Sequence, residues 1–487
     1  MSSFDFHNPL DFFYDNAEQR PTAVAYIFKG ISSTYGELLI RVEKQMGWLA
    51  DKGIRYGSKV ALFSDNDFSI LTSTFAVWSL GAVVIPINIE QTSEKLLQII
   101  ETVEPDIVLS DMDTRAKELF KCEVIGFNGD TGSSAAKVEV GEEDRAIIMF
   151  TSGTSGVPKA VPITYRALGH NCFHTAQALA ISPDDRILIN SPPYFTSAIV
   201  HNLTMFSGGA SVVVDRSMLL ANAIFELIEK YECTGFGGVP VHFARIEGCL
   251  ESSGKPDGLR FLMNSGEHLP VPLLKKVHDK MPDVEIFCVY GLTEVAGRFC
   301  ILPPKDLDRK AGSVGKPLAG MEVSVRDDSG QQLQPHELGE VYVSGITLMS
   351  GYLNNDIANQ KSMKEYGFAT GDIGKIDEDG YVFLEGRTDD VMKVGGEKVS
   401  LKMIEESALS FPPVGEVIAV PIQHDLMGSV PCLYYTLKPG GKLKKKEILK
   451  YLRGKLPSSH VPAFLEEIDE IPRASSGKKL RSFFAAQ

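Results

Sequence analysis

Segments with the patterns of strands and helices alternate along most of this chain, and this alternation constrains the fold more than any other feature. Short apolar runs predict strands at 211–214, 234–239, 261–263 and 284–290, and the segments between them show helical spacing of apolar residues. Repeated strand–helix units of this length favour parallel sheets with helices on both faces. Ligands of such sheets bind at the carboxyl ends of the strands, where loops lead into helices.

The first half of the chain shows the same alternation. Thr34 and Glu37 have the spacing of a capping box, which predicts the start of a helix. Strands are predicted at 60–63, 82–87 and 106–109, with helices between them. The expected fold class is therefore α/β, with layers of parallel strands and helices.

The chain also has the length of more than one domain. Its 487 residues exceed the ~250–300 at which a single core usually stops growing. The C-terminal part has a different pattern, with strands at 415–420 and 432–437 and a lysine-rich helix near 444–456, which is typical of a small α+β domain. We therefore predict a large N-terminal domain, 1–387, and a small C-terminal domain, 388–487.

The composition disfavours several classes of partner. The 49 basic and 63 acidic residues give a net charge of −14, which disfavours binding to nucleic acid or to an anionic membrane. The most apolar segment, 75–87, is shorter than the ~20 residues that span a bilayer, and the N-terminus lacks the pattern of a signal peptide. The seven cysteines are dispersed without a CxxC pair, which indicates reduced thiols. We expect a cytoplasmic protein without membrane insertion.

A loop rich in glycine and hydroxyl side chains follows the apolar strand predicted at 147–150. Its glycines permit turns that direct backbone N–H groups at an anion, and its lysine adds positive charge. Pro158 precedes that lysine, where a Walker A loop requires glycine. Phosphate binding is favoured over a flexible hairpin, because a strand leads directly into the loop. The candidate phosphate-binding residues are Thr151, Ser152, Gly153, Thr154, Ser155, Gly156 and Lys159.

Three further segments carry chemically useful residues, although each has an ordinary structural alternative. The sequence YGLTE at 290–294 places an aromatic ring, a hydroxyl and a carboxylate where a strand ends, as an ordinary strand-to-loop corner also would. The sequence TGD, which ends at Asp372, suits ribose hydroxyls but also a hairpin. The sequence SSGK, which ends at Lys478, would by itself pass for a basic tail.

Taken in order, these segments resemble the adenylate-forming superfamily, which contains acyl- and aryl-CoA ligases, nonribosomal peptide synthetase adenylation domains and luciferases. The motifs are TSGTSGVPK, YGLTE, GEVYVSG with GYLNN, TGD with GR, and SSGK, and the resemblance extends from Thr34 to Arg481. It implies ATP-dependent activation of a carboxylic acid to acyl-AMP with release of pyrophosphate, followed by transfer to a thiol. The implied cofactors are ATP and Mg²⁺, with CoA or phosphopantetheine as co-substrate. The implied fold adds a distorted barrel and a mobile C-terminal domain.

The resemblance also assigns roles to residues that match its motifs. The catalytic residues it implies are Lys478, Thr293 and Glu294, of which Glu294 would also bind the metal. Besides the loop at 151–159, the nucleotide-binding residues it implies are Gly266, Glu267, Tyr290, Gly291, Asp372 and Arg387. The acid-pocket residues it implies are Phe195, Thr196, His201, Phe236, Asn264 and Ala296. The hinge would be Asp389, and the thiol channel would pass Gly395 and Gly396.

The acid pocket departs from the pattern of amino-acid-activating members in one informative place. Those members carry an aspartate that pairs with the α-ammonium group, whereas this chain has Phe195 and Thr196 there. An unpaired ammonium in such a pocket is costly, which favours an aryl or aliphatic acid without an α-amino group. The alternatives are a stand-alone amino-acid adenylation enzyme that loads a separate carrier protein and a regulatory nucleotide-binding protein. The sequence leaves open the acid, the choice between CoA and a carrier protein, the pathway and the oligomeric state.

Overall fold

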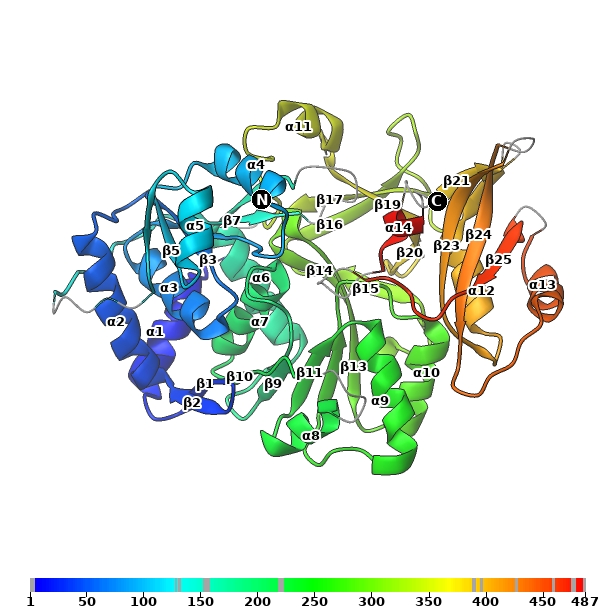
Figure 1. Ribbon diagram of the computed structural model, residues 1–487, viewed down its shortest axis with the longest axis horizontal. Coiled ribbons are helices and arrows are strands. Elements are labelled where there is room, and N and C mark those ends of the chain that lie inside the picture. The colour runs from blue at the N-terminus through cyan, green and yellow to red at the C-terminus, as the bar shows by residue number, and fades with distance from the viewer. Residues whose placement is uncertain are drawn as a thin grey trace.

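The protein has a large N-terminal part and a smaller C-terminal part beside it, coloured orange to red in Figure 1. Both parts contain sheets covered by helices, and the larger part contains two separate sheets. The computed structural model describes residues 5–127, 129, 133–151, 158–217, 223–387, 391–394, 397–424, 428–457, 460–473 and 479–484.

A six-stranded sheet forms the first layer of the large part. Its order is β6-β5-β3-β4-β7-β8, and its neighbouring strands are parallel except for β7 and β8. The strands are β3 (Lys59–Phe63), β4 (Val83–Pro86), β5 (Ile107–Ser110), β6 (Glu123–Ile125), β7 (Arg145–Phe150) and β8 (Ala160–Thr164). The helices along this stretch are α1 (Pro9–Gln19), α2 (Tyr35–Asp51), α3 (Asp67–Ser79), α4 (Ser93–Val103) and α5 (Asp113–Leu119).

A 14-stranded sheet forms the rest of the large part, and its first half is mainly parallel, as the sequence predicts. These strands are β1 (Val24–Phe28), β2 (Ile31–Thr34), β9 (Arg186–Ile189), β10 (Ser211–Val214), β11 (Gly235–Gly238), β12 (Phe261–Asn264) and β13 (Glu285–Leu292). The accompanying helices are α6 (Tyr165–Ala178), α7 (Thr196–Ser207), α8 (Ala223–Lys230), α9 (Pro240–Ser253) and α10 (Val271–Lys280).

The second half of this sheet is antiparallel and continues from β13 through β14. Its strands are β14 (Gly297–Leu302), β15 (Ser313–Pro317), β16 (Met321–Arg326), β17 (Gly339–Gly345), β18 (Met363–Lys364), β19 (Gly367–Ile376) and β20 (Val382–Arg387). A helix, α11 (Asp356–Ser362), and two short 3₁₀ turns, η1 (Thr293–Val295) and η2 (Pro304–Asp306), interrupt them. The switch from parallel to antiparallel pairing falls at the end of β13, where the YGLTE motif lies.

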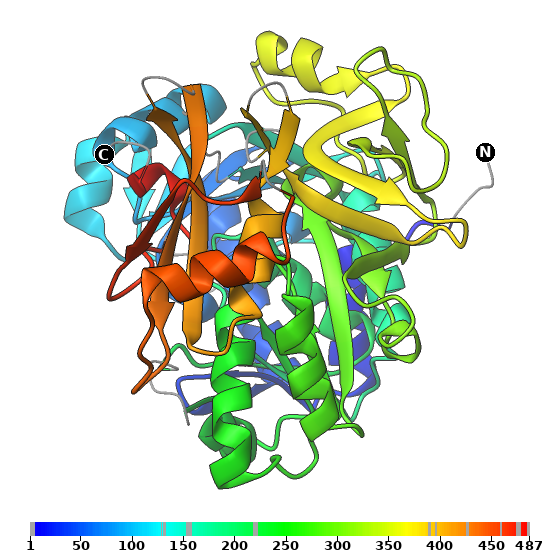
Figure 2. The same cartoon turned by 90° about the vertical axis from the view of Figure 1, so that its right-hand side faces the viewer.

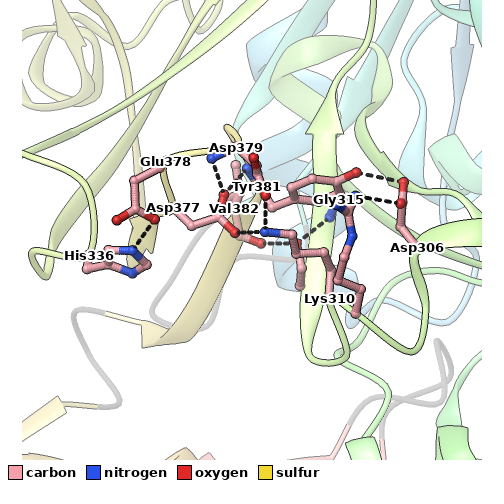
Figure 3. Close-up of polar contacts among 11 residues, drawn as sticks. Asp306, Lys310, Gly315, His336, Asp377, Glu378, Asp379, Tyr381 and Val382 are labelled. Carbon is pink, nitrogen blue, oxygen red and sulfur yellow. Dashed lines mark hydrogen bonds and ion pairs between the residues drawn. The ribbon is translucent and has the colours of Figure 1, made fainter.

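A polar cluster holds the turn of the hairpin formed by β19 and β20 (Figure 3). The Asp377 carboxylate accepts a hydrogen bond from the Tyr381 backbone N–H at 2.8 Å, and the Lys310 ammonium lies 2.6 Å from the same carboxylate. Further along the hairpin, Asp372 and Arg387 are directly paired across the two strands. The cluster therefore fixes the two strands that carry these predicted ribose-binding residues.

The C-terminal part is a small α+β unit (Figure 2). Helices α12 (Leu401–Leu409) and α13 (Lys445–Arg453) pack on one face of its three-stranded sheet, and α14 (Arg481–Phe484) packs on the other. The sheet consists of β23 (Val414–His424), β24 (Gly428–Leu437) and β25 (Phe464–Glu467), and a separate hairpin consists of β21 (Val391–Val394) and β22 (Glu397–Ser400). The architecture agrees with the predicted fold class, while the exact boundary after residue 387 stays a prediction.

Several local predictions are confirmed. The Glu37 backbone N–H donates to the Thr34 hydroxyl at 3.2 Å and the Thr34 backbone N–H donates to the Glu37 carboxylate at 2.8 Å, which completes the capping box. All seven cysteines are free. In the described part of the chain, no helix is both long and apolar enough to span a membrane.

Candidate active site

The predicted nucleotide-binding residues Tyr290, Asp372 and Arg387 meet in the structure. The Tyr290 hydroxyl donates a hydrogen bond to the Asp372 carboxylate, and its buried ring packs against Phe299 with centroids 4.4 Å apart. Burial and the neighbouring Asp372 raise the pKa of Tyr290 well above its usual value. The Arg387 guanidinium lies 3.8 Å from Asp372 and donates to the Thr370 carbonyl at 3.1 Å. An aromatic wall, a carboxylate and a cation are thus held together.

Thr370, which sequence reasoning did not single out, positions Asp372. Its buried hydroxyl accepts a hydrogen bond from the Asp372 backbone N–H at 3.0 Å and donates to the Val341 carbonyl at 2.7 Å. The TGD motif contains this threonine, so the sequence offered a sign of it. Its role could not be predicted, however, because it depends on the contact with Val341 on β17, which is distant in sequence.

Gly291 has a steric reason to be glycine. A β-carbon at this position would lie 2.2 Å from the Gly297 carbonyl oxygen, because β13 and β14 approach closely where their register shifts. The same close pairing brings Thr293 and Glu294 to the beginning of a tight turn, η1. The glycine of YGLTE is therefore explained by chain packing, independently of any role in nucleotide binding.

A second group of contacts joins Glu294 to the candidate phosphate-binding loop. The Tyr352 hydroxyl donates to the Glu294 carboxylate at 2.7 Å, and the Lys159 ammonium lies 4.7 Å from the centroid of the Tyr352 ring. Burial and the nearby Glu294 raise the pKa of Tyr352. Sequence reasoning listed GYLNN as a motif without assigning a role to its tyrosine. Tyr352 is thus a site residue whose contacts appear only in the fold.

The two ends of the loop at 151–159 are joined by backbone contacts. The Thr151 N–H donates to the Lys159 carbonyl at 3.1 Å, and the Lys159 N–H donates to the Thr151 hydroxyl at 3.4 Å. The Ala160 carbonyl, next in the chain, accepts from the Leu353 N–H at 2.9 Å. The predicted residues Ser152, Gly153, Thr154, Ser155 and Gly156 lie outside the described residues, and their roles stay predictions.

The donor set around Glu294 suits Mg²⁺ that is bound together with nucleotide phosphates. Mg²⁺ commonly uses one or two carboxylates and completes its six-coordinate shell with water and phosphate oxygens. Glu294 supplies one carboxylate, and the Thr293 hydroxyl supplies a further oxygen beside it. Within the described residues, no group of three or more metal-binding side chains forms a separate protein-only site. Glu294 and Thr293 offer two oxygen donors, which fits a metal whose remaining ligands are phosphate oxygens and water.

The predicted acid-pocket residues divide into two groups. The Thr196 hydroxyl lies 3.3 Å from the Thr293 hydroxyl, and His201 follows on the same helix, α7, with its ring against Gly237. Ala296 is fully buried in a left-handed conformation that ends η1. Phe195 precedes α7 and is half-buried. These residues lie along α7 and the segment that follows β13.

Phe236 and Asn264 occupy other surroundings. Successive side chains of a strand point to opposite faces, so Phe236 lies on the face of β11 opposite to that of Gly237. It packs in the core, with its ring edge-to-face against His242. The structure therefore does not bring Phe236 together with His201. The Asn264 amide donates to the Glu267 carbonyl at 2.8 Å at the carboxyl end of β12.

The C-terminal part contacts the candidate site through Lys479 and through α12. The Lys479 backbone N–H donates to the Glu267 carboxylate at 3.1 Å, and His268 forms a second contact with Glu406 on α12 at 3.1 Å. Gly266, which precedes Glu267, has a positive φ of 88°. Four predicted residues lie outside the described part of the chain, and their roles stay predictions: Lys478, Asp389, Gly395 and Gly396.

Comparison with family models identifies the chain. The model of the AMP-binding enzyme family matches residues 13–353, and the model of the AMP-binding enzyme C-terminal domain matches residues 403–478. The chain belongs to the AMP-binding enzyme family. This membership confirms the predicted adenylate-forming superfamily.

Named relatives match over almost their whole length. A 2-succinylbenzoate–CoA ligase from Geobacillus sp. (strain WCH70) is 30% identical over 452 residues, covering 92% of this chain and 91% of the relative. A 2-succinylbenzoate–CoA ligase from Bacillus subtilis (strain 168) is 28% identical over 474 residues, covering 96% and 95%. These similarities support the predicted reaction class, in which an AMP-forming enzyme activates a carboxylic acid and ligates it to a thiol.

Solved structures of the family share the fold. The o-succinylbenzoate CoA synthetase (MenE) from Bacillus subtilis, in complex with the acyl-adenylate intermediate OSB-AMP, matches with a TM-score of 0.86, 26% identity and 97% coverage of each chain. ATP-bound MatB from Rhodopseudomonas palustris matches with a TM-score of 0.89, 25% identity and 99% coverage of each chain. The predicted two-domain fold class is therefore confirmed.

Folding stability should fall in acid because of His201, which is 2% exposed. Burial, assisted by the charge of Arg298, lowers the pKa of His201 from 6.5 to about 3. The contribution of neutral His201 to the free energy of unfolding is fully present above pH 6.5. It is lost as the pH falls below 6.5, because the unfolded chain then binds a proton at this histidine and the folded chain does not. Each pH unit corresponds to about 1.4 kcal/mol, so a drop to pH 5 should cost roughly 2 kcal/mol at this site.

The His201→Gln variant should therefore lose less stability between pH 7 and pH 5 than the parent protein does. Urea unfolding followed by tryptophan fluorescence measures this difference in the large part, since both tryptophans, Trp48 and Trp78, lie there. The exposed His336 provides a control as His336→Gln. An unchanged pH dependence in His201→Gln would contradict the burial of a neutral histidine.

Proposed function

We propose that this protein is an AMP-forming CoA ligase for an aromatic carboxylic acid that lacks an α-amino group. The observation that carries the choice of acid is a buried cation, Arg298, which donates to Thr204 on the helix that also carries Thr196 and His201. In the described part of the chain, Arg298 forms no ion pair with an acidic side chain. An α-ammonium group would meet a like charge there, whereas an uncharged aromatic ring would not.

The proposed acceptor is CoA, and the proposed acid is aromatic, because the relatives are named for 2-succinylbenzoate and CoA. Transfer to a separate carrier protein remains the alternative acceptor. The proposed nucleotide is ATP with Mg²⁺, in agreement with the B. subtilis o-succinylbenzoate CoA synthetase that was solved in complex with ATP and magnesium ion.

In the first half-reaction, an oxygen of the carboxylate attacks the α-phosphorus of ATP, and the bond to the bridging oxygen of pyrophosphate breaks. We assign Tyr290 to the adenine, Asp372 and Arg387 to the ribose, and Thr293 with Glu294 to the α-phosphate side. Lys478 would offset the repulsion between the two reacting anions, since preorganised charge is the main means of stabilising such a transition state. Bound Mg²⁺ would neutralise charge that develops on the phosphate oxygens.

In the second half-reaction, the thiolate of CoA attacks the acyl carbon of the adenylate. The new carbon–sulfur bond forms as the carbon–oxygen bond to AMP breaks, and the thiol proton is released. The residues at 388–396 would adjust the placement of the C-terminal part between the two steps, with Asp389 as the hinge. Gly395 and Gly396 would then give the pantetheine arm a path past the backbone.

The proposal is tested by ATP–pyrophosphate exchange and thioester formation with a panel of aryl, aliphatic and amino acids. We expect exchange with aryl acids and, after addition of CoA, an acyl-CoA product together with AMP. Exchange that responds only to amino acids would contradict the choice of acid. Product that forms only on a phosphopantetheinyl carrier protein, and not on CoA, would contradict the choice of acceptor.

A further inference from the structure

Arg298, on β14, is a buried arginine whose hydrogen-bonding capacity is only partly used. The residue is 4% exposed, and its Nη1 donates to the Thr204 hydroxyl at 2.8 Å. Its Nη2 is buried and has no hydrogen-bond acceptor among the described residues. Burial lowers the pKa of Arg298 to about 10, so the guanidinium still carries its charge at neutral pH. A buried charge without a partner is costly, and this position therefore favours an incoming anion.

Contacts at successive turns of α7 place Arg298 beside the end of this helix that is far from Thr293. The helix lies beside the segment that follows β13, and the three contacts occur four residues apart on one helix face. In the first contact, the Thr196 hydroxyl lies 3.3 Å from the Thr293 hydroxyl. In the second, the Val200 side chain would lie 3.1 Å from a β-carbon added at Gly297. In the third, the Arg298 guanidinium donates to the Thr204 hydroxyl at 2.8 Å. The helix rises about 1.5 Å per residue, so the last contact lies about 12 Å beyond the first.

His201 contributes a second unpartnered atom at this end. Its Nδ1 lies 2.5 Å from the Ser197 carbonyl, which can only accept, so Nδ1 carries the proton and Nε2 carries a lone pair. Nε2 is buried without a partner, and a β-carbon added at Gly237 would lie 2.8 Å from it. Gly237 thus leaves room for the His201 ring, and the charge of Arg298 reaches this ring.

We propose that Arg298 and His201 bind a second carboxylate of the acid, on the order of 10 Å from the carboxylate that becomes activated. The guanidinium donates to this carboxylate, and its fork geometry suits two parallel hydrogen bonds. Burial, more than the charge of Arg298, keeps His201 neutral in the free protein. A carboxylate bound beside the ring favours its protonated form, in which Nε2 donates as well. The inference rests on the proposed function and narrows its substrate to a dicarboxylic acid.

Matched acids provide the first test in the wild-type protein. The probes are 2-succinylbenzoate with each of its two monoamides, and heptanedioate with its monoamide. We expect kcat/KM for pyrophosphate exchange to fall at least about 100-fold when the remote carboxylate becomes an amide, as expected for the loss of a buried charged partner. A monoamide that reacts as well as its diacid would overturn the inference.

Variants of the arginine provide the second test. In Arg298→Met, exchange with the diacid should fall by a factor of about 100 or more, while exchange with the monoamide stays the same or improves. Arg298→Lys, which keeps the charge, should recover part of the preference. Thr204→Val, which removes only the acceptor of Nη1, should retain the preference for the diacid. Equal losses with both acids in Arg298→Lys would overturn the inference, because they would show that the arginine is only structural.

The failure of the inference is distinguishable from failure of the proposed function. Exchange with neutral aryl acids, combined with no preference for diacids, would overturn the second-carboxylate site and leave the ligase intact. Absence of exchange with every probe and every acid of the panel would overturn the proposed function and the inference together. If Arg298→Met does not fold, the matched acids and Arg298→Lys still decide between these outcomes.

Discussion

The Lys478→Ala variant should lose adenylate formation by a factor of about 10²–10³ and retain thioester formation from supplied acyl-AMP. The carboxylate and the α-phosphate are both anions, and the lysine that the family resemblance assigns to this step would offset their repulsion only while they react. The second step joins a thiolate to an adenylate that is already formed, so it does not need that charge. Separate assays of pyrophosphate exchange and of thioester formation from synthetic acyl-AMP measure the two effects.

Lys479→Ala is the matched control. The Lys479 backbone N–H contacts Glu267, and its ammonium donates to the Val417 carbonyl at 2.8 Å. The variant therefore keeps the contact with Glu267 and removes a neighbouring positive charge. It should retain most of the exchange activity, although it also removes the hydrogen bond from the ammonium to Val417. Equal losses in both half-reactions of Lys478→Ala, or equal losses in the two variants, would contradict a specific role of Lys478 in adenylation.

Glu294→Gln should lower the rate of adenylate formation on the order of 10²-fold and raise the Mg²⁺ concentration needed for half-maximal rate. The change removes the negative charge, yet the amide oxygen can still accept the hydrogen bond that Tyr352 donates to the Glu294 carboxylate at 2.7 Å. The variant therefore isolates the charge from the packing. Initial rates of exchange measured across a range of Mg²⁺ concentrations test the expectation.

Tyr352→Phe is the complementary variant, because it tests the hydrogen bond to Glu294 without changing the charge of Glu294. It removes the hydrogen bond to Glu294 but keeps both the carboxylate and the ring under Lys159. We expect a smaller loss, about tenfold, with a nearly unchanged dependence on Mg²⁺. A Glu294→Gln variant whose Mg²⁺ dependence matches that of the parent protein would show that Glu294 does not act through the metal.

The sequence could predict the elements and motifs of this protein because both depend on local patterns. The alternation of apolar runs and helical spacing leads to parallel strands, as in β10 to β13. The capping box of Thr34 and Glu37 is local by its nature, and the structure contains it. Tyr290 and Asp372 could be singled out because the family resemblance matches the short motifs that contain them, and the structure brings the two side chains together.

Contacts between distant strands could not be predicted from these patterns. The contact between Tyr352 and Glu294 depends on how the antiparallel strands after β13 pair with one another. Neither segment's sequence by itself determines the register of this pairing. The family resemblance implies Phe236 as an acid-pocket residue, whereas its place in the core beside His242 follows from the direction of its side chain on β11. Its role in the pocket stays a prediction. Arg298 resembles an ordinary strand residue until Thr204 and the burial of its guanidinium are seen.

The most direct test of the account follows oxygen from the acid into AMP. A reaction with an aryl acid whose carboxylate is labelled with ¹⁸O should give AMP that carries one labelled oxygen, unlabelled pyrophosphate and the acyl-CoA product. That outcome requires a bond between the carboxylate and the α-phosphorus. Label in inorganic phosphate, with ADP as the nucleotide product, would mean attack at the γ-phosphorus and would contradict the acyl-AMP intermediate.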